Sequence, residues 1–145
     1  MTPAVIDASV AIKWVVEEEG TPDALALLKG AALKAPDLLL AECANILWKK
    51  VAKKELLTDE AIMAARLIQQ VDMEIFTTRS LLEDATRLAI ELDHPAYDCI
   101  YLSLALHNGW RFITADTRLI RKLAQLDAAR FGGLALSLAE DKHAL

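Results

Sequence analysis

Four acidic residues stand where a carboxylate can serve chemistry as readily as structure. Asp7 and Asp116 each follow a short apolar segment of strand character, and each precedes a helical segment. Glu42 and Asp98 each interrupt a long apolar segment of helical character near its beginning. Four carboxylates brought together would raise one another's pKa, and a divalent cation offsets that cost. No paired His or Cys accompanies them, so hard oxygen ligands favour Mg²⁺ or Mn²⁺ over zinc.

Each acid also has a structural explanation. Asp and Ser are preferred N-cap residues, so Asp7, Ser9 and Asp116 could simply cap the helices that follow them. Asp98 lies in a segment too apolar to be largely exposed, and must face either solvent or a partner. These alternatives stay open for each residue taken alone.

Glu42 belongs to a polar helix face. Spacings of three and four residues place it on one face with Asn45, Ile46, Lys49 and Lys53. The helix dipole favours a carboxylate near the helix start by about 0.3 to 1 kcal/mol. A solvated stripe is the structural alternative, since charged helix positions are usually exposed.

Strand and helix segments alternate along the chain. Strands are predicted at 4–6, 33–36, 73–77 and 111–114, with a fifth near 129–131. Helices are predicted at 11–19, 22–30, 38–54, 58–70, 80–92, 96–107 and 117–126, with N-caps at Thr21, Asp37 and Thr58 and a capping box of Ser80 and Glu83. This alternation predicts an α/β fold with a parallel sheet covered on both faces. If the first and fourth strands are neighbours, Asp7 and Asp116 come side by side at the edge where such sheets bind ligands.

Composition fits one globular domain. The 145 residues are 54% hydrophobic, enough for a sizeable core. No basic and apolar leader and no membrane-length apolar run are present, so a cytoplasmic protein without membrane contact is expected. Cys43 and Cys99 lie in apolar runs and predict buried reduced thiols. The apolar settings of Trp14, Trp48 and Trp110 predict core positions.

The net charge is −5, which at first argues against a polyanionic ligand. Clustered carboxylates around cations would hide much of that charge from such a ligand. Lys49, Lys53 and Arg118 could then contact the phosphates of such a ligand, although lysines at helix ends often serve solubility alone. The five glycines form neither GxGxxG nor GxxxxGK[ST], so the sequence gives no support to a nucleotide-binding α/β protein.

Four stretches together resemble a known family. VIDASV, PDLLLAECANILW, AYDCIYLSLAL and FITADTRLIRKL are similar, in order and spacing, to the acidic motifs of PIN-domain ribonucleases, and most of all to VapC-type toxins of bacterial toxin–antitoxin pairs. The resemblance implies a three-layer α/β/α fold with a five-stranded, mostly parallel sheet, and a Mg²⁺- or Mn²⁺-dependent endoribonuclease. Residues 1–145 would form one such domain, with 131–145 a tail outside the family pattern.

The resemblance also implies residue roles and partners. Asp7 and Asp98 match the principal metal ligands, Asp116 the further acidic ligand, and Glu42 the acid that orients metal or water. The supporting polar residues of the family are matched by Ser9, Asn45 and Thr114. RNA is the implied substrate, a VapB-type antitoxin the implied protein partner, and a homodimer the implied assembly.

Other functions fit the residues less well. A catalytically silent PIN-like module that binds RNA or a protein is the main alternative, and the presence of all four acids argues against it. Phosphotransfer through Asp7 in the manner of haloacid-dehalogenase phosphatases wants a second Asp where Ser9 stands. A zinc site built from His94, His107, His143 and the cysteines fails on spacing.

Overall fold

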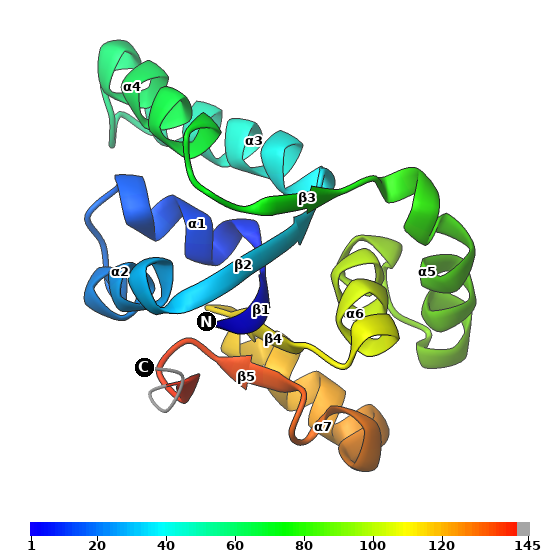
Figure 1. Ribbon diagram of the computed structural model, residues 1–145. Coiled ribbons are helices and arrows are strands. Elements are labelled where there is room, and N and C mark those ends of the chain that lie inside the picture. The colour runs from blue at the N-terminus through cyan, green and yellow to red at the C-terminus, as the bar shows by residue number, and fades with distance from the viewer. Residues whose placement is uncertain (142–145) are drawn as a thin grey trace.

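The core of the protein is a parallel β-sheet. The computed structural model describes residues 1–141. Five strands pair in the order β3-β2-β1-β4-β5, all parallel (Figure 1). They are β1 (Thr2–Ile6), β2 (Ala31–Pro36), β3 (Glu74–Phe76), β4 (Arg111–Thr114) and β5 (Ala135–Ser137). The central strand is therefore β1, and β4 is its neighbour, as required for Asp7 and Asp116 to lie at neighbouring strand ends.

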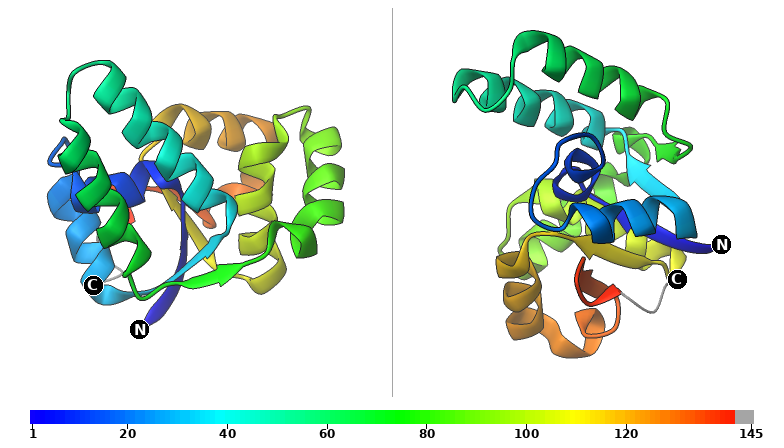
Figure 2. Two further views of the ribbon diagram at one scale, coloured as in Figure 1. Left: turned by 90° about the horizontal axis from the view of Figure 1, so that it is seen from above. Right: turned by 90° about the vertical axis from the view of Figure 1, so that its left-hand side faces the viewer.

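Helices cover both faces of the sheet. They are α1 (Ala8–Val15), α2 (Thr21–Gly30), α3 (Leu38–Ala52), α4 (Thr58–Gln69), α5 (Thr78–Leu92), α6 (Ala96–Asn108) and α7 (Thr117–Phe131). On one face α1, α2 and α3 pack against the strands, and α4 packs on α3. On the other face α6 packs on the sheet with α5 outside it, while α7 lies against β5. The α3–α4 pair projects beyond the sheet (Figure 2). The predicted three-layer α/β/α fold is confirmed.

The two most buried elements, β1 and α6, hold the backbone at the end of the sheet where the acids lie. In β1, Ala4, Val5 and Ile6 are fully buried, as expected for a central strand with both faces covered. In α6, seven consecutive residues from Cys99 to Ala105 are buried, so this helix is fixed against both the sheet and α5. Gly109 ends α6 with φ +67°, the left-handed conformation that glycine adopts without strain. Asp7 and Asp98 therefore extend from well-held backbone.

The fifth strand was predicted in the wrong place. Residues 129–131 form the end of α7, which continues past a kink at Asp127, and the strand follows at Ala135–Ser137. The first helix was also misplaced, since it begins at Ala8 and ends at Val15 instead of spanning 11–19. Ala8 and Ser9, the small residues that follow β1, are the first two residues of this helix.

Several helix caps differ from the predictions. Helix α5 has Thr77 as N-cap, accepting from the Ser80 backbone N–H, so the predicted Ser80–Glu83 capping box is wrong. Thr21 and Thr58 are the first helical residues, and Gly20 and Leu57 occupy the N-cap positions.

Two further side chains depart from their predicted environments. Asp37 occupies the N-cap of α3, but its carboxylate accepts from Thr78 instead of capping the helix. Trp48, predicted in the core, is 62% exposed. Trp14 and Trp110 pack against the core as predicted, and both cysteines are buried thiols. Within residues 1–141, no helix combines the length and apolar character needed to cross a membrane.

Candidate functional site

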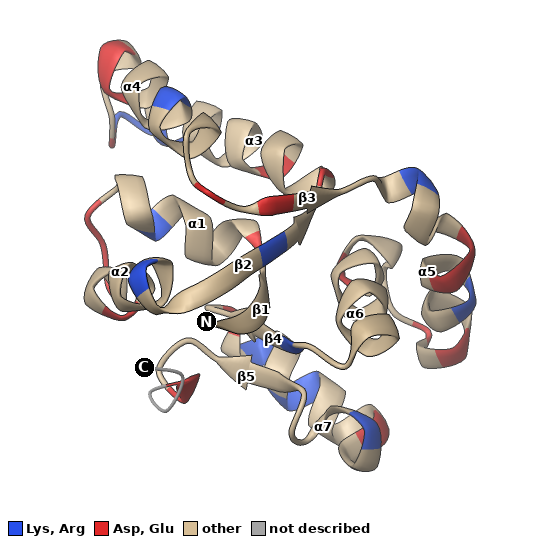
Figure 3. Cartoon of the chain, viewed as in Figure 1, with Lys and Arg blue, Asp and Glu red and all other residues tan. Residues whose placement is uncertain are grey.

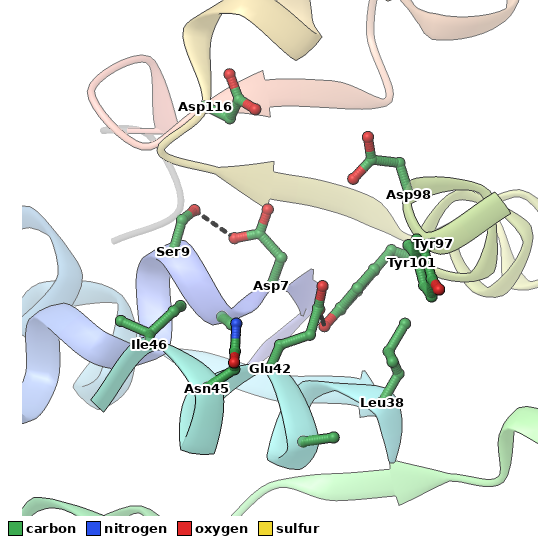
Figure 4. A pocket seen from close by; sticks show the side chains of 12 residues that line it. Asp7, Ser9, Leu38, Glu42, Asn45, Ile46, Tyr97, Asp98, Tyr101 and Asp116 are labelled. Carbon is green, nitrogen blue, oxygen red and sulfur yellow. Dashed lines mark hydrogen bonds between the residues drawn. The ribbon is translucent and has the colours of Figure 1, made fainter. Parts of the chain in front are cut away.

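One cavity of about 410 Å³ lies at the carboxyl ends of β1 and β4. Its walls come from the beginnings of α1, α3, α6 and α7, which all start at this edge of the sheet. It is lined by Asp7, Ala8, Ser9, Leu38, Ala41, Glu42, Asn45, Ile46, Tyr97, Asp98, Tyr101 and Asp116. Figure 4 shows the carboxylates of Asp7, Glu42 and Asp98 around one space, with Asp116 at its far rim. The cavity thus brings together the four acids identified in the sequence.

Asp7 occupies the floor of the cavity. It holds the N-cap position of α1, yet its side chain makes no capping hydrogen bond. Instead its two carboxylate oxygens accept from the hydroxyls of Ser9 and Thr114, each at 2.5 Å. Burial raises the pKa of Asp7 to about 6 against the opposing effect of these hydroxyls, and the negative charge of Asp98 adds to the rise. The Asp7 carboxylate is therefore held chiefly by the hydroxyls of Ser9 and Thr114 at the strand ends.

Glu42 faces the same cavity from the second turn of α3. Its Oε1 accepts a hydrogen bond from the hydroxyl of Tyr101, a buried residue of α6. Burial raises the pKa of Glu42, the Tyr101 hydrogen bond opposes the rise, and the charge of Asp98 adds to it. Asn45 and Ile46 line the cavity beside Glu42, so the predicted shared helix face is confirmed for these three residues.

Asp98 lies in the first turn of α6. Its Oδ2 is 2.7 Å from Nε2 of His94, whose ring is almost buried in the connection between α5 and α6. The Asp98 side chain itself is 40% exposed and reaches the cavity. Because its charge raises the pKa of both Asp7 and Glu42, Asp98 couples the acids electrostatically.

Asp116 combines two functions that the sequence left as alternatives. Its Oδ1 accepts from the backbone N–H groups of Arg118 and Leu119, so it does cap α7. It also lines the cavity with the other acids. A carboxylate that caps through one oxygen keeps the lone pairs of the other for a ligand.

The supporting polar residues tie the strand ends together. Ser9 Oγ accepts from the Ala115 backbone N–H and lies 3.4 Å from Thr114 Oγ1. Thr114, fully buried behind the cavity, in turn accepts from the Asp116 backbone N–H. These bonds link β1, α1 and the β4–α7 connection directly, and so fix Asp7 relative to Asp116.

The donor set fits a hard divalent cation. All side-chain donors of the four acids are oxygens, and burial and mutual repulsion leave Asp7 and Glu42 with raised pKa values that a cation would reverse. Among residues 1–141, no three His, Cys, Asp or Glu side chains lie close enough to ligate one ion together. Mg²⁺ does not require this, because it usually keeps several waters and is held by one or two carboxylates.

The basic residues selected from the sequence do not line the cavity. Lys49, Lys53 and Arg118 are all exposed. Arg118 stands at the beginning of α7, directly after the cap residue Asp116, while the two lysines lie further along α3. Figure 3 shows basic residues on α7 and at the α3–α4 connection.

Sequence reasoning missed Tyr101, Tyr97 and His94. Tyr101 contacts Glu42 across 59 positions of the chain, for which no local pattern exists. His94 is four residues before Asp98, and this spacing is the signal in the sequence that could have indicated their contact. Tyr97 lines the cavity and is 67% exposed, an unusual position for an aromatic ring.

The sequence was compared with known families. The PIN domain family matches residues 4–126, most of the chain and the whole span between the first and last cavity acids. The chain belongs to the PIN domain family. PIN domains are generally nucleases, so membership supports a hydrolase acting on nucleic acid. A sequence search of curated proteins gave no significant match.

Solved PIN-like structures share the fold of this PIN domain. PAE2754 from Pyrobaculum aerophilum is 21% identical, with a TM-score of 0.67 over 96% of this chain and 85% of that one. VapC20 of Mycobacterium tuberculosis, described as a toxin that cleaves the sarcin–ricin loop, is 14% identical, with a TM-score of 0.60 over 77% of this chain and 86% of that one. At these identities the likeness establishes a common fold.

Proposed function

We propose that this PIN domain is a Mg²⁺- or Mn²⁺-dependent endoribonuclease that acts as the toxin of a type II toxin–antitoxin pair. The observation that carries the proposal is the single cavity into which Asp7, Glu42, Asp98 and Asp116 project from four elements. Structural explanations account for these acids one at a time, but not for their meeting where burial opposes their ionisation. The fold shared with an RNA-cleaving toxin supports the choice of RNA.

Each acid has a distinct part in this proposal. Asp7 and Asp98 are the principal ligands of the cation, and Asp116 offers the oxygen that does not cap α7. Glu42 orients the cation or the attacking water, held in place by Tyr101. When bound, the cation would lower the pKa of a water nucleophile and stabilise the charge that develops on the phosphodiester.

The polar surroundings position these groups. Ser9 and Thr114 hold both oxygens of Asp7, and Asn45 presents an amide at the cavity wall beside Glu42. Lys49, Lys53 and Arg118 supply exposed positive charge for the RNA backbone on either side of the acids.

The proposed partners follow from the family. A VapB-type antitoxin would restrain the nuclease, the active toxin would be a homodimer, and both would act in the cytoplasm. Copurification with the product of a neighbouring reading frame and sedimentation of the isolated toxin test these two assemblies separately.

Cleavage by antitoxin-free protein tests the activity. With Mg²⁺ or Mn²⁺, the wild type is expected to cut single-stranded RNA internally, and Asp7→Asn and Asp98→Asn to lose cutting while keeping the wild-type circular dichroism. Asp72→Asn, a change at an exposed acid outside the cavity, is the matched control and should cut normally. RNA binding without metal binding or cleavage would instead identify a catalytically silent PIN-like module.

A further inference from the structure

We propose that His94 is a positioning residue, which holds the Asp98 carboxylate by one oxygen and leaves the other for a divalent cation. The inference rests on the proposed function, because it concerns the residue that positions one of the proposed metal ligands. Its basis is the 2.7 Å contact between His94 Nε2 and Asp98 Oδ2, and the environment that makes this contact rigid.

The backbone of His94 is fixed on both sides. Its N–H donates to Ala89 O and closes the end of α5, where Asp93 takes φ +50°. Its carbonyl oxygen accepts from the Cys99 thiol at 3.9 Å. The ring itself is 7% exposed. His94 is thus a fixed donor beside the partly exposed Asp98, and of the two it is the residue able to orient the other.

Helix α6 leaves Asp98 free for this contact. Asp98 is the third residue of α6, the position from which an acid normally reaches back to the N–H of the N-cap residue. The N-cap is Pro95, which has no N–H. His94 therefore supplies the hydrogen bond that the helix end cannot.

A common arrangement appears at three of the acids. Glu42 is held at Oε1 by Tyr101, Asp116 at Oδ1 by two backbone N–H groups, and Asp98 at Oδ2 by His94. In each case the hydrogen bonds of residues 1–141 engage one carboxylate oxygen only. Hydrogen-bond partners outside a metal site orient its ligands in this way. One carboxylate oxygen is held, and the other stays available to the cation.

The contact also determines which ring nitrogen of His94 is the hydrogen-bond donor. A carboxylate only accepts hydrogen bonds, so Nε2 must carry the proton that is shared with Asp98. Nδ1 is buried and has no hydrogen-bond partner among residues 1–141. The contact with Asp98 is therefore the one hydrogen bond that the His94 ring makes among the described residues.

Two amide substitutions separate this role from simple packing. The amide nitrogen of Gln lies as many bonds from the backbone as Nε2, and that of Asn as many as Nδ1. His94→Gln should therefore keep the wild-type affinity for Mn²⁺ within about threefold, and His94→Asn should weaken it by about 10- to 100-fold. Electron paramagnetic resonance of Mn²⁺ titrated into the protein, without RNA, measures both. His107→Gln, at the exposed end of α6, is the control and should leave the affinity unchanged.

A second measurement needs no variant. The ¹⁵N chemical shifts of the His94 ring in the metal-free wild type should report a hydrogen on Nε2, the nitrogen that donates to Asp98. An Nε2 without hydrogen would overturn the proposal, as would equal Mn²⁺ affinities of folded His94→Gln and His94→Asn. In the latter case wild-type metal binding and cleavage would leave the proposed function standing. A wild type that binds no Mn²⁺ would refute both.

Discussion

Asp7 carries its carboxylate on the floor of the cavity, where burial opposes ionisation. Its pKa in the folded chain is about 6, against 3.8 for an exposed aspartate. The folded state therefore holds this proton over a range of pH in which the unfolded chain has released it. As pH rises through this range, the free energy of unfolding falls, and the full cost of the buried charge is present at neutral pH.

Replacing Asp7 should for this reason stabilise the metal-free protein. Asp7→Asn removes the buried charge, and the free energy of unfolding at neutral pH should rise by about 1 to 3 kcal/mol. Urea denaturation in EDTA at acidic and neutral pH measures this, with the gain disappearing toward acid. Asp72→Asn should show no gain at either pH. An equal or lower stability of Asp7→Asn at neutral pH would contradict the buried-charge account.

Cation binding should displace the proton of Asp7. Since a ligating carboxylate must be ionised, binding should release about one proton per ion near pH 5 and about none near pH 7.5. Calorimetric titration with Mn²⁺ in two buffers of different ionisation enthalpy counts these protons. A release that does not change across this range would place the cation away from Asp7.

At the scale of elements, a buried ion pair fastens the segment that follows β5 to the sheet. Arg111 of β4 lies 2.9 Å from Asp141, their side chains are 14% and 5% exposed, and Arg111 also donates to Pro3 O. This pair joins the segment after β5 to the amino end of β1 and the start of β4. The region predicted to be a tail is therefore part of the folded domain as far as Asp141.

Breaking this pair should cost far more than breaking an exposed one. Asp141→Ala leaves a buried guanidinium without its partner, and should lower the free energy of unfolding by about 3 to 5 kcal/mol. Arg87→Ala, which removes the exposed pairs with Glu83 and Asp84, should cost at most about 1 kcal/mol. Chemical denaturation compares the two. Equal losses would mean that the C-terminal segment detaches without consequence for the domain.

Local pattern predicted most elements and failed at the last strand. Apolar runs identified β1 and β4 correctly, and β-branched residues and strand length were sufficient there. The three residues of β5 owe their pairing to β4, a contact that leaves no local signal. Likewise α7 is interrupted at Asp127, whose backbone is not helical, and one further turn follows in which Asp127 Oδ1 accepts from the Arg130 N–H and Phe131 is buried in the core.

In the site, the positions of the acids could be predicted from the sequence, but their hydrogen-bond partners on other elements could not. Parallel topology alone places Asp7 beside Asp116, and helical spacing places Glu42 on a face with Asn45. The positions of Tyr101 and His94 beside the acids depend on how α6 packs against α3 and α5, which no pattern in the sequence specifies. That Asp7, Asp98 and Asp116 are the ligands of a cation stays a prediction.

At the scale of the molecule, the cavity is lined by four acids and, among residues 1–141, by no lysine or arginine. Four carboxylates face one cavity, while Lys49, Lys53 and Arg118 are exposed on the two helices beside it. A net charge of −5 therefore understates the attraction for a phosphate backbone once a cation occupies the cavity.

The salt dependence of RNA binding tests this surface. In a catalytically inactive Asp98→Asn background, Lys49→Ala, Lys53→Ala and Arg118→Ala should each weaken binding, and each should reduce the slope of log affinity against log salt by about 0.7. Fluorescence anisotropy at several salt concentrations measures the slope. Lys29→Ala, at the opposite end of the sheet before β2, is the control. Slopes that match the control would place the RNA on another face.

Asp116 both caps α7 and lines the cavity, so a substitution at this position changes two things at once. Alanine at this position would remove a carboxylate and also unravel the first turn of α7, so lost cutting could reflect a displaced Arg118 as much as a missing ligand. Asparagine is as good an N-cap as aspartate, and it separates the two effects. The isosteric amide, not truncation, is therefore the informative exchange here.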